Sequence, residues 1–250
     1  MQQRRQRITE MVNREGQVTF SDLKNAFPEV SEMTLRTDLK YLDENSAIIR
    51  IHGGAKSIDT IAGTDGFLST RTVRNQASKK IIAQKAIALL HGKSSVFIDS
   101  GSTATLLSKY IPDEPRQIFT CGVSCATELA VLSRPSIHLL GGRLNRFSLS
   151  VAGSRSILEL QSHHFDICFL GATGFHPALG FCCESEEDCV LKQVALARSE
   201  YKVVLIDSSK FDRMNTHCIC LANDVDAVVT DDQITQQQRA YFVSQGVEVF

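Results

Sequence analysis

Seven short apolar runs alternate with stretches of helical spacing between residue 95 and the C-terminus of the 250-residue chain. The apolar runs are Ser95–Ile98, Ile118–Thr120, Ile137–Leu140, Ile167–Leu170, Val203–Ile206, Ala227–Thr230 and Val247–Phe250. The helical stretches between them are Thr103–Tyr110, Cys125–Leu132, Ser154–Gln161, Glu187–Ser199 and Thr235–Gln245. This alternation predicts an α/β fold with a mostly parallel sheet and helices on both of its faces.

The first 56 residues have a different pattern. Helical spacing predicts a helix over Gln3–Glu15, a short helix over Asp22–Ala26 capped by Ser21, and a third helix that begins after Ser31. Residues 47–55 are predicted to form a two-stranded hairpin with a Gly-Gly turn near its end. Three short helices followed by a hairpin are typical of a winged helix-turn-helix.

A lapse in the apolar pattern separates these two regions. Between residues 57 and 74, Gly63 and Gly66 stand among Thr, Asp and Ser, and a strong helix over Asn75–His91 follows. We therefore expect a winged helix-turn-helix at 1–56, a linker at 57–74 and an α/β domain at 75–250.

The bulk composition constrains the function class only weakly. The formal net charge is -1, so DNA binding would depend on where the charges lie. No apolar run reaches the ~20 residues of a membrane helix, and no apolar stretch follows the basic N-terminus. We expect a cytoplasmic protein that contacts no membrane.

All eight cysteines lie after Thr120. A cytoplasmic chain keeps them reduced, and no pair has the C-x₂-C spacing of a zinc knuckle. We expect small buried side chains, with a metal site as the less favoured alternative. No cofactor is predicted.

The third helix offers a candidate DNA-reading face. Leu35, Leu39 and Leu42 line one side of it, so its polar side faces away from the core. Side chains near the N-terminus of a groove-binding helix reach base edges, and its positive end favours phosphates. The predicted DNA contacts are Ser31, Thr34, Arg36, Thr37, Lys40 and, in the wing, Arg50 and His52, with Arg4, Arg5 and Arg7 against the flanking backbone. The alternative is an ordinary three-helix module with a solvated polar face.

Several predicted strands are followed by small, hydroxyl or basic residues. Ligands of open α/β sheets bind at the carboxyl ends of the strands, and a glycine-rich turn into a helix can hold an anion. The candidates are Asp99, Ser100, Gly101, Ser102, Thr103, Gly141, Gly142, Arg143, Gly171 and Thr173. Glu184, Asp188 and Lys192, at four-residue spacing, more often form a solvated ladder of charges than a site.

The N-terminal pattern, including Val30-Ser31-Glu32, Thr34-Leu35-Arg36, Asp38-Leu39 and His52-Gly53-Gly54-Ala55, resembles the signature of the DeoR-type transcription regulators. The C-terminal part of the chain resembles the sensor domain of the same family. The matching residues are Asp99–Thr103, Gly141-Gly142, Gly153, Gly171–Gly174, Lys192 and Asp207–Phe211. The resemblance implies a sensor fold similar to ribose-5-phosphate isomerase, a sugar-phosphate-type effector, and Lys192 and Lys210 as ligand contacts.

The chain departs from the family pattern in three places. Thr37 stands where the family usually has a second basic residue, Ser46 where it has glycine, and Cys121-Gly122 where it often has asparagine. These departures weaken one DNA contact, place the helix cap in question and leave the identity of the effector open.

Three functions compete on these observations. The preferred one is a regulator, with repression the favoured sign, that binds an operator as a dimer or tetramer and responds to a phosphorylated metabolite. The second is a sugar-phosphate isomerase or deaminase, for which Asp99, Glu184 and Asp188 are candidate bases. We expect no enzyme activity, because fold alone does not carry function. The third is a protein–protein adaptor with a helix-turn-helix shape.

Overall fold

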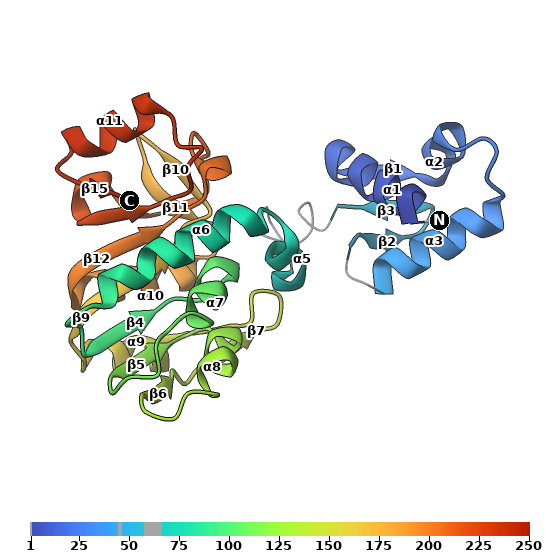
Figure 1. Cartoon of the computed structure of the whole chain (residues 1–250). Coiled ribbons are helices and arrows are strands. Elements are labelled where there is room, and N and C mark those ends of the chain that lie inside the picture. The colour runs from blue at the N-terminus through green and yellow to red at the C-terminus, as the bar shows by residue number, and fades with distance from the viewer. Residues whose placement is uncertain (1, 45–46, 58–66) are drawn as a thin grey trace. The chain divides into compact units, whose positions relative to one another are not determined.

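The computed structural model describes residues 2–44, 47–57 and 67–250. The chain divides into two compact units, Met1–Arg71 and Thr72–Phe250, here called the N-terminal and C-terminal units (Figure 1). Most of the predicted linker, residues 58–66, lies outside the described residues, as do Asn45 and Ser46. The end of the predicted linker is occupied by a short helix, α5 (Leu68–Val73), rather than irregular chain. The domain boundaries stay a prediction.

The N-terminal unit contains three helices and a small sheet. Its elements are α1 (Gln2–Glu15), β1 (Gln17–Thr19), α2 (Phe20–Ala26), α3 (Glu32–Glu44), β2 (Ile49–Ile51) and β3 (Gly54–Lys56). The hairpin β2–β3 was predicted, but β1 also joins it, so the sheet has the antiparallel order β1-β3-β2. Buried apolar residues from all three helices and the sheet, among them Ile8, Leu23 and Leu35, form one core.

The start of α2 and the hairpin turn differ from the prediction. Helix α2 begins at Phe20 and is capped by Thr19, because Thr19 and Asp22 each accept a hydrogen bond from the other's backbone N–H (3.2 and 2.8 Å). Ser21 lies inside the helix and is not the cap. Gly53 has φ +82° in the turn, whereas Gly54 is already in β3, where an added Cβ would lie 2.1 Å from the carbonyl oxygen of Val18.

The C-terminal unit is built on a seven-stranded sheet in the order β15-β14-β12-β9-β4-β5-β6. Every strand pair in it is parallel. The strands are β4 (Ser95–Ile98), β5 (Gln117–Thr120), β6 (Ser136–Leu139), β9 (Phe165–Gly171), β12 (Ser199–Leu205), β14 (Ala227–Val229) and β15 (Glu248–Val249). All seven were predicted within a few residues. The chain moves outward from β4 to β6 and then in the opposite direction from β9 to β15, so the order switches between β4 and β9.

Helices cover both faces of this sheet (Figure 1). They are α6 (Gln76–Ile87), α7 (Ser102–Ser108), α8 (Val123–Leu129), α9 (Ser154–Gln161), α10 (Glu186–Ala197) and α11 (Gln236–Ser244), with a 3₁₀ turn, η1 (Ala88–Leu90), after α6. Within β4, Phe97 packs into one apolar cluster with side chains of α9, α10 and α11, while Val96 and Ile98 pack into a second cluster with α6, α7 and α8. The predicted two-faced α/β arrangement is therefore confirmed.

Two small antiparallel sheets were not predicted. One is the hairpin of β7 (Arg143–Asn145) and β8 (Ser150–Ala152). The other joins β10 (Gly174–His176), β11 (Gly180–Cys183) and β13 (His217–Cys220). Two 3₁₀ turns, η2 (Ser208–Lys210) and η3 (Ala222–Asp224), complete the unit. The strands β7, β8 and β10 have three residues each, of which at most two are apolar, so they do not form the apolar runs that marked the large sheet. Strand β11 is buried along its whole length.

The cysteines behave as small core side chains. Seven are buried and Cys218 is exposed. Burial raises the pKa of the Cys125 and Cys168 thiols to about 11. Among the described residues, no group of three or more His, Cys, Asp or Glu is arranged to hold a metal ion. No helix in the described part of the chain has the length and apolar character needed to cross a bilayer.

A buried carboxylate joins α1 to α3. Asp38 is 1% exposed and accepts hydrogen bonds from the Nε atoms of Arg4 (2.6 Å) and Arg5 (2.7 Å). Burial acts to raise the pKa of Asp38, but the hydrogen bonds and charges of the two arginines outweigh it and hold the pKa below its ordinary value. Arg4 and Arg5, predicted as contacts to the DNA backbone, therefore have a structural partner inside the unit.

We predict that Asp38→Asn lowers the free energy of unfolding of the N-terminal unit by about 1–3 kcal/mol at pH 7, because an amide cannot accept from both guanidinium groups. A carboxylate whose pKa is lowered on folding stabilises above its unfolded pKa of ~3.9, and this contribution disappears as the pH falls below that value. Urea unfolding followed by circular dichroism should show the difference between the two proteins shrinking from pH 6 to pH 3. A difference independent of pH would contradict this. Glu15→Gln, in an exposed ion pair with Arg14, is the control.

Candidate nucleic-acid interface and effector site

The start of α3 is fixed by hydroxyl groups. The backbone N–H of Thr34 donates to Oγ of Ser31 (3.2 Å), so Ser31 is the predicted cap. The two hydroxyls also share a hydrogen bond of 2.8 Å. Leu35 and Leu39 are buried beneath this turn, which leaves the opposite side of the helix at the surface.

Arg36 lies on that outer side. Its guanidinium sits over the ring of Phe20, 4.5 Å from the centroid, and 4.0 Å from the Glu32 carboxylate. The side chain is 56% exposed, so the stacked guanidinium still presents N–H donors to solvent. Thr37 and Lys40 are exposed on the same side, one turn apart.

The two predicted wing residues are also at the surface. Arg50 is exposed in β2, where its backbone N–H donates to Asp43 of α3 (2.9 Å), and His52 is exposed in the hairpin turn. This bond fixes the wing to the helix. Of the seven contacts predicted from α3, its cap and the wing, Thr34 is half-buried and the other six are exposed.

The topological switch point holds the second candidate site. Asp99 directly follows β4, and Gly171 ends the neighbouring strand β9. The backbone N–H of Gly171 donates to Oδ2 of Asp99 (2.9 Å), and the ammonium of Lys192, from α10, forms an ion pair with the same oxygen. Asp99 is 1% and Lys192 7% exposed. The structure thus brings together three predicted residues from three separate segments.

The prediction of a solvated charge ladder is wrong for Lys192. Burial alone would lower its pKa, but the attraction of Asp99 and Asp188 raises it above the ordinary value. Lys192 is therefore a fixed buried cation. Glu184 and Asp188 have other partners: Glu184 accepts from the side chain of Asn215 (3.0 Å) and Asp188 from the hydroxyl of Ser150 (3.4 Å).

Two cysteines complete the surroundings of Asp99. The Cys121 thiol donates to Oδ1 of Asp99 (3.4 Å), and the Cys125 thiol donates to its backbone oxygen (3.3 Å). Burial and the Asp99 charge hold the pKa of Cys121 well above its ordinary value, so it remains a neutral donor. The sequence signalled this position only as a departure from the family pattern at Cys121-Gly122.

The loop after β4 turns directly into α7. Gly101 precedes the helix with φ +107°, a backbone conformation that favours glycine. Ser102 is buried in the first turn, and Ser100 and Thr103 are half-buried. These four residues therefore directly follow Asp99 in the chain and lie at the carboxyl end of the sheet.

The loop after β6 is more exposed than the loop after β4. Gly141 donates its N–H to Glu159 of α9 (3.2 Å), and Gly142 has φ +151°. Arg143 lies at the surface and pairs with Glu187 (2.5 Å), and its hydrogen bond to that carboxylate raises its pKa. Its charge is thus already engaged by the first turn of α10.

The loops after β9 and β12 pack against each other. The ammonium of Lys210 donates to the carbonyl oxygen of Ala172 (3.0 Å). The hydroxyl of Thr173 donates to Cys182 (3.1 Å), so it is used in joining the loop to β11. Asn75 donates to Asp207 (3.1 Å) and to Ser209 (2.9 Å), which fixes the second loop to the start of α6. No pattern in the sequence indicated this role for Asn75.

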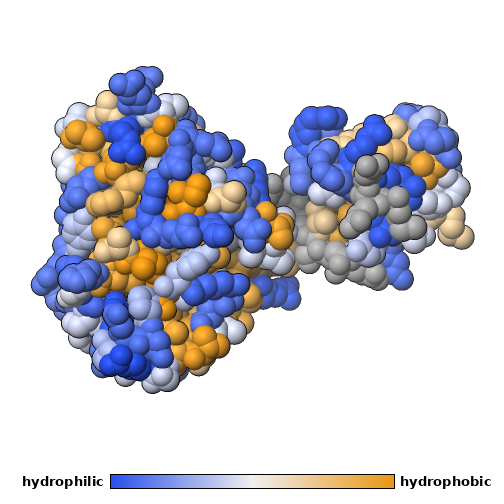
Figure 2. Space-filling model, in the orientation of Figure 1, coloured by the Kyte–Doolittle hydropathy of each residue, from blue (hydrophilic) through white to orange (hydrophobic). Residues whose placement is uncertain are grey.

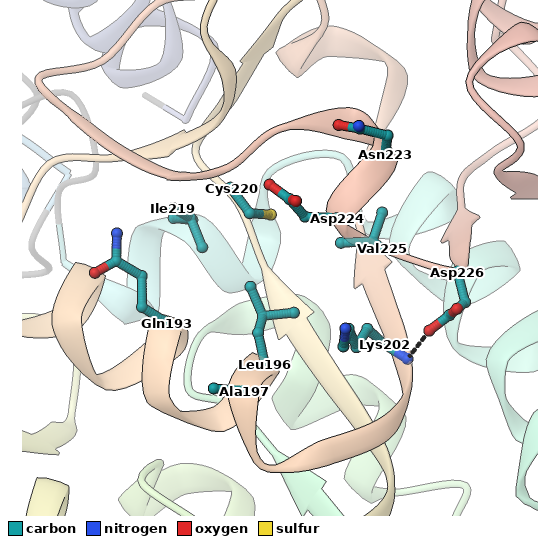
Figure 3. Close-up of a pocket in the computed structure, with 10 residues that line it drawn as sticks. All are labelled: Gln193, Leu196, Ala197, Lys202, Ile219, Cys220, Asn223, Asp224, Val225 and Asp226. Atoms are coloured by element: carbon teal, nitrogen blue, oxygen red, sulfur yellow. Dashed lines mark hydrogen bonds between the residues drawn. The ribbon is translucent and has the colours of Figure 1, made fainter.

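A cavity of about 380 Å³ lies at the amino ends of the sheet strands, opposite the loops that carry the candidate effector residues (Figure 3). Lys202 and Asp226 line it, and Asp226 immediately precedes β14, so it marks the amino end of that strand. The backbone N–H of Lys202 donates to Asp226 (2.8 Å). None of the predicted effector residues lines this cavity.

In the comparison with known proteins, two different family domains match the N-terminal and the C-terminal part of the chain. Residues 4–61 match the DeoR-like helix-turn-helix domain, and residues 74–232 match the DeoR C-terminal sensor domain. The chain belongs to the DeoR family. A DeoR-family chain is a transcription regulator that combines a DNA-binding helix-turn-helix with a sensor domain.

Full-length relatives agree with the family assignment. The chain is 31% identical to the HTH-type transcriptional regulator YulB of Bacillus subtilis, over 92% of this chain and 88% of the relative. It is 29% identical to the putative aga operon transcriptional repressor of Escherichia coli O157:H7, over 99% and 92% of the two chains. It is 28% identical to the lactose phosphotransferase system repressor of Streptococcus mutans, over 93% and 92%.

Two solved structures have distant likenesses to this DeoR-family chain. A ribose-5-phosphate isomerase in complex with phospho-erythronic acid covers 53% of this chain, and 52% of its own length, with 18% identity and a TM-score of 0.38. The beta subunit of eIF2B from Chaetomium thermophilum covers 68%, and 54% of its own length, with 12% identity and a TM-score of 0.46. Likenesses this weak carry no information on activity.

We predict that Lys192→Met lowers the free energy of unfolding by about 3–5 kcal/mol, because it leaves the Asp99 carboxylate buried without its cation. The double variant Asp99→Asn, Lys192→Met removes both charges and should recover most of this loss. The measurement is urea-induced unfolding of the full chain. Lys109→Met removes an exposed lysine that pairs with the half-buried Glu128; it is the matched control and should cost about 0–1 kcal/mol. Equal losses from the two lysine variants would contradict the prediction.

Proposed function

We propose that the chain is a repressor that binds its operator through α3 and the wing, and that a phosphorylated sugar or related metabolite weakens this binding. The observation that carries the proposal is the buried Asp99–Lys192 pair at the switch point between β4 and β9. The relatives whose names refer to the aga operon and to the lactose phosphotransferase system support an effector from sugar metabolism.

The proposed effector site uses the loops at the carboxyl edge of the sheet. The Gly101 turn and the backbone N–H groups that begin α7 would receive an anion. Lys210 and the Gly171–Thr173 segment would lie on the other side, and the Asp99–Lys192 pair would fix hydroxyl groups of the ligand between them. The proposed effector contacts are Asp99, Ser100, Gly101, Ser102, Thr103, Gly141, Gly142, Arg143, Gly171, Thr173, Lys192 and Lys210.

The proposed regulation is a coupling between two sites. An effector shifts a conformational equilibrium only by as much as it favours one state over the other. We propose that the chain acts as a dimer or larger homo-oligomer, whose paired α3 helices match two half-sites in only one of these states. The proposed contacts to DNA are Ser31, Thr34, Arg36, Thr37, Lys40, Arg50 and His52.

Catalysis at the same site is less well supported. A general base needs a free carboxylate within reach of the substrate. Asp99 already accepts from the N–H of Gly171 and from Lys192, and Glu184 and Asp188 each accept from a neighbour. The geometry therefore favours binding of a ligand over abstraction of a proton from it.

We predict that Arg36→Ala weakens specific operator binding by roughly 1–3 kcal/mol, because it removes a bidentate donor from the outer side of α3. Binding to unrelated DNA should change less, since most of that affinity comes from phosphate contacts. A fluorescence-anisotropy titration at fixed salt measures both constants. Unchanged operator affinity would show that Arg36 is not a reader of bases.

We predict that phosphorylated sugars, and not the same sugars without phosphate, raise the stability of the full chain in a thermal-shift screen. At a hundredfold excess over the dissociation constant, the gain is about 2.7 kcal/mol. Gly101→Val should abolish this gain and the release of DNA by the effector, while DNA binding without effector persists. Gly92→Val, at another glycine with positive φ (+71°), is the control for backbone strain. An effector that still released DNA from the Gly101 variant would contradict the proposed site.

A further inference from the structure

The outer face of α3 carries an exposed apolar side chain in its first turn. Met33 is 75% exposed, and the other large exposed hydrophobic residue in the described part of the N-terminal unit, Tyr41, is 44% exposed. The visible face of this unit is otherwise mainly hydrophilic (Figure 2). An unbranched, flexible thioether at this position contributes nothing to the core, since the core side of α3 is formed by Leu35, Leu39 and Leu42.

Thr37 extends the apolar surface by one turn. Its hydroxyl donates to the carbonyl oxygen of Met33 (2.9 Å), so the polar part of the side chain is turned back onto the helix. The group that remains for an external partner is the Cγ2 methyl. Residues four apart lie next to each other on a helix, so Met33 and Thr37 form one apolar patch, here called the Met33–Thr37 patch.

Positive charges border this patch. Arg36 and Lys40 lie on the same side of α3, and Arg50 is exposed in the neighbouring wing. One carboxylate lies among them, since Glu32 is exposed 4.0 Å from the guanidinium of Arg36. The hydroxyls of Ser31 and Thr34 bond to each other at the start of the helix. A partner that is anionic at its edges and has small apolar groups at its centre therefore fits this face.

We propose that the Met33–Thr37 patch packs against the C5 methyl groups of thymines in the major groove, and that each operator half-site carries at least one thymine at this position. Thymine alone presents a methyl group in the major groove, and the threonine methyl is one of the groups that reads it. Phosphates on both sides of the groove match the bordering cations. The inference rests on the proposed DNA-binding function and names which bases it reads.

The test begins with DNA selected by the full-length protein from a random double-stranded pool. Each thymine of a selected half-site is then replaced by deoxyuridine, which removes the methyl group and leaves every hydrogen-bonding atom in place. Burial of one methyl group is worth about 0.8 kcal/mol. We therefore expect at least one replacement in each half-site to weaken binding about fourfold, with no change in the dependence on salt.

Two variants connect that loss to the patch. Met33→Ala keeps a good helix former and removes the thioether, and Thr37→Ser keeps the hydroxyl bond to Met33 and removes only the methyl. Each should weaken binding to the thymine-containing site and respond less than the parent chain to deoxyuridine at that position. Lys40→Ala is the control and should weaken binding to both DNAs by the same factor.

The remaining outcomes overturn the inference. Selected half-sites without thymine, or deoxyuridine replacements that leave binding unchanged while Arg36→Ala weakens it, would remove the thymine contact and leave the DNA-binding function standing. Variants that stay as sensitive to deoxyuridine as the parent chain would place the methyl contact elsewhere. A selection that enriches no sequence would overturn this inference and the proposed function together.

Discussion

The ion pair between Lys192 and Asp99 is the interaction on which the arrangement of the C-terminal unit depends. A carboxylate at 1% exposure is tolerated only with a counter-charge and hydrogen-bond donors, and Asp99 receives Lys192, the N–H of Gly171 and the thiol of Cys121. These donors come from α10, β9 and the loop after β5. One carboxylate therefore fixes three elements at the place where the strand order switches, and the candidate effector loops are built around it.

A buried carboxylate paired with cations also joins two elements of the N-terminal unit. Asp38 is buried and joins α1 to α3 through Arg4 and Arg5, while the apolar side chains of α3 pack beneath it. The position of the reading helix is thus set by contacts on its inner side. Its outer side can then vary in sequence without loss of the fold, which is where a DNA-binding domain needs freedom.

The sequence predicts the large elements because their signals are long or repeated. Runs such as Ser95–Ile98 are apolar and have the length of a strand. Ser31 was predicted as the cap of α3 because its hydroxyl can accept a backbone N–H, and it accepts that of Thr34. The strands β7, β8 and β10 were not predicted because each has only three residues, of which at most two are apolar. At α2 the reciprocal bonds between Thr19 and Asp22 outweighed the intrinsic preference of Ser21 for a cap position.

The candidate sites were only partly accessible to sequence reasoning. The loops after the strands were found because the carboxyl ends of parallel strands share one edge. Four-residue spacing placed Lys192 with Glu184 and Asp188, whereas its actual partner, Asp99, lies 93 residues away in the chain. Spacing reports neighbours on one helix but not the burial that decides between a solvated charge and a fixed cation. The exposure of Met33, by contrast, follows from spacing, because Met33 precedes Leu35 by two residues and Leu39 by six and therefore lies on the opposite side of α3 from the core leucines.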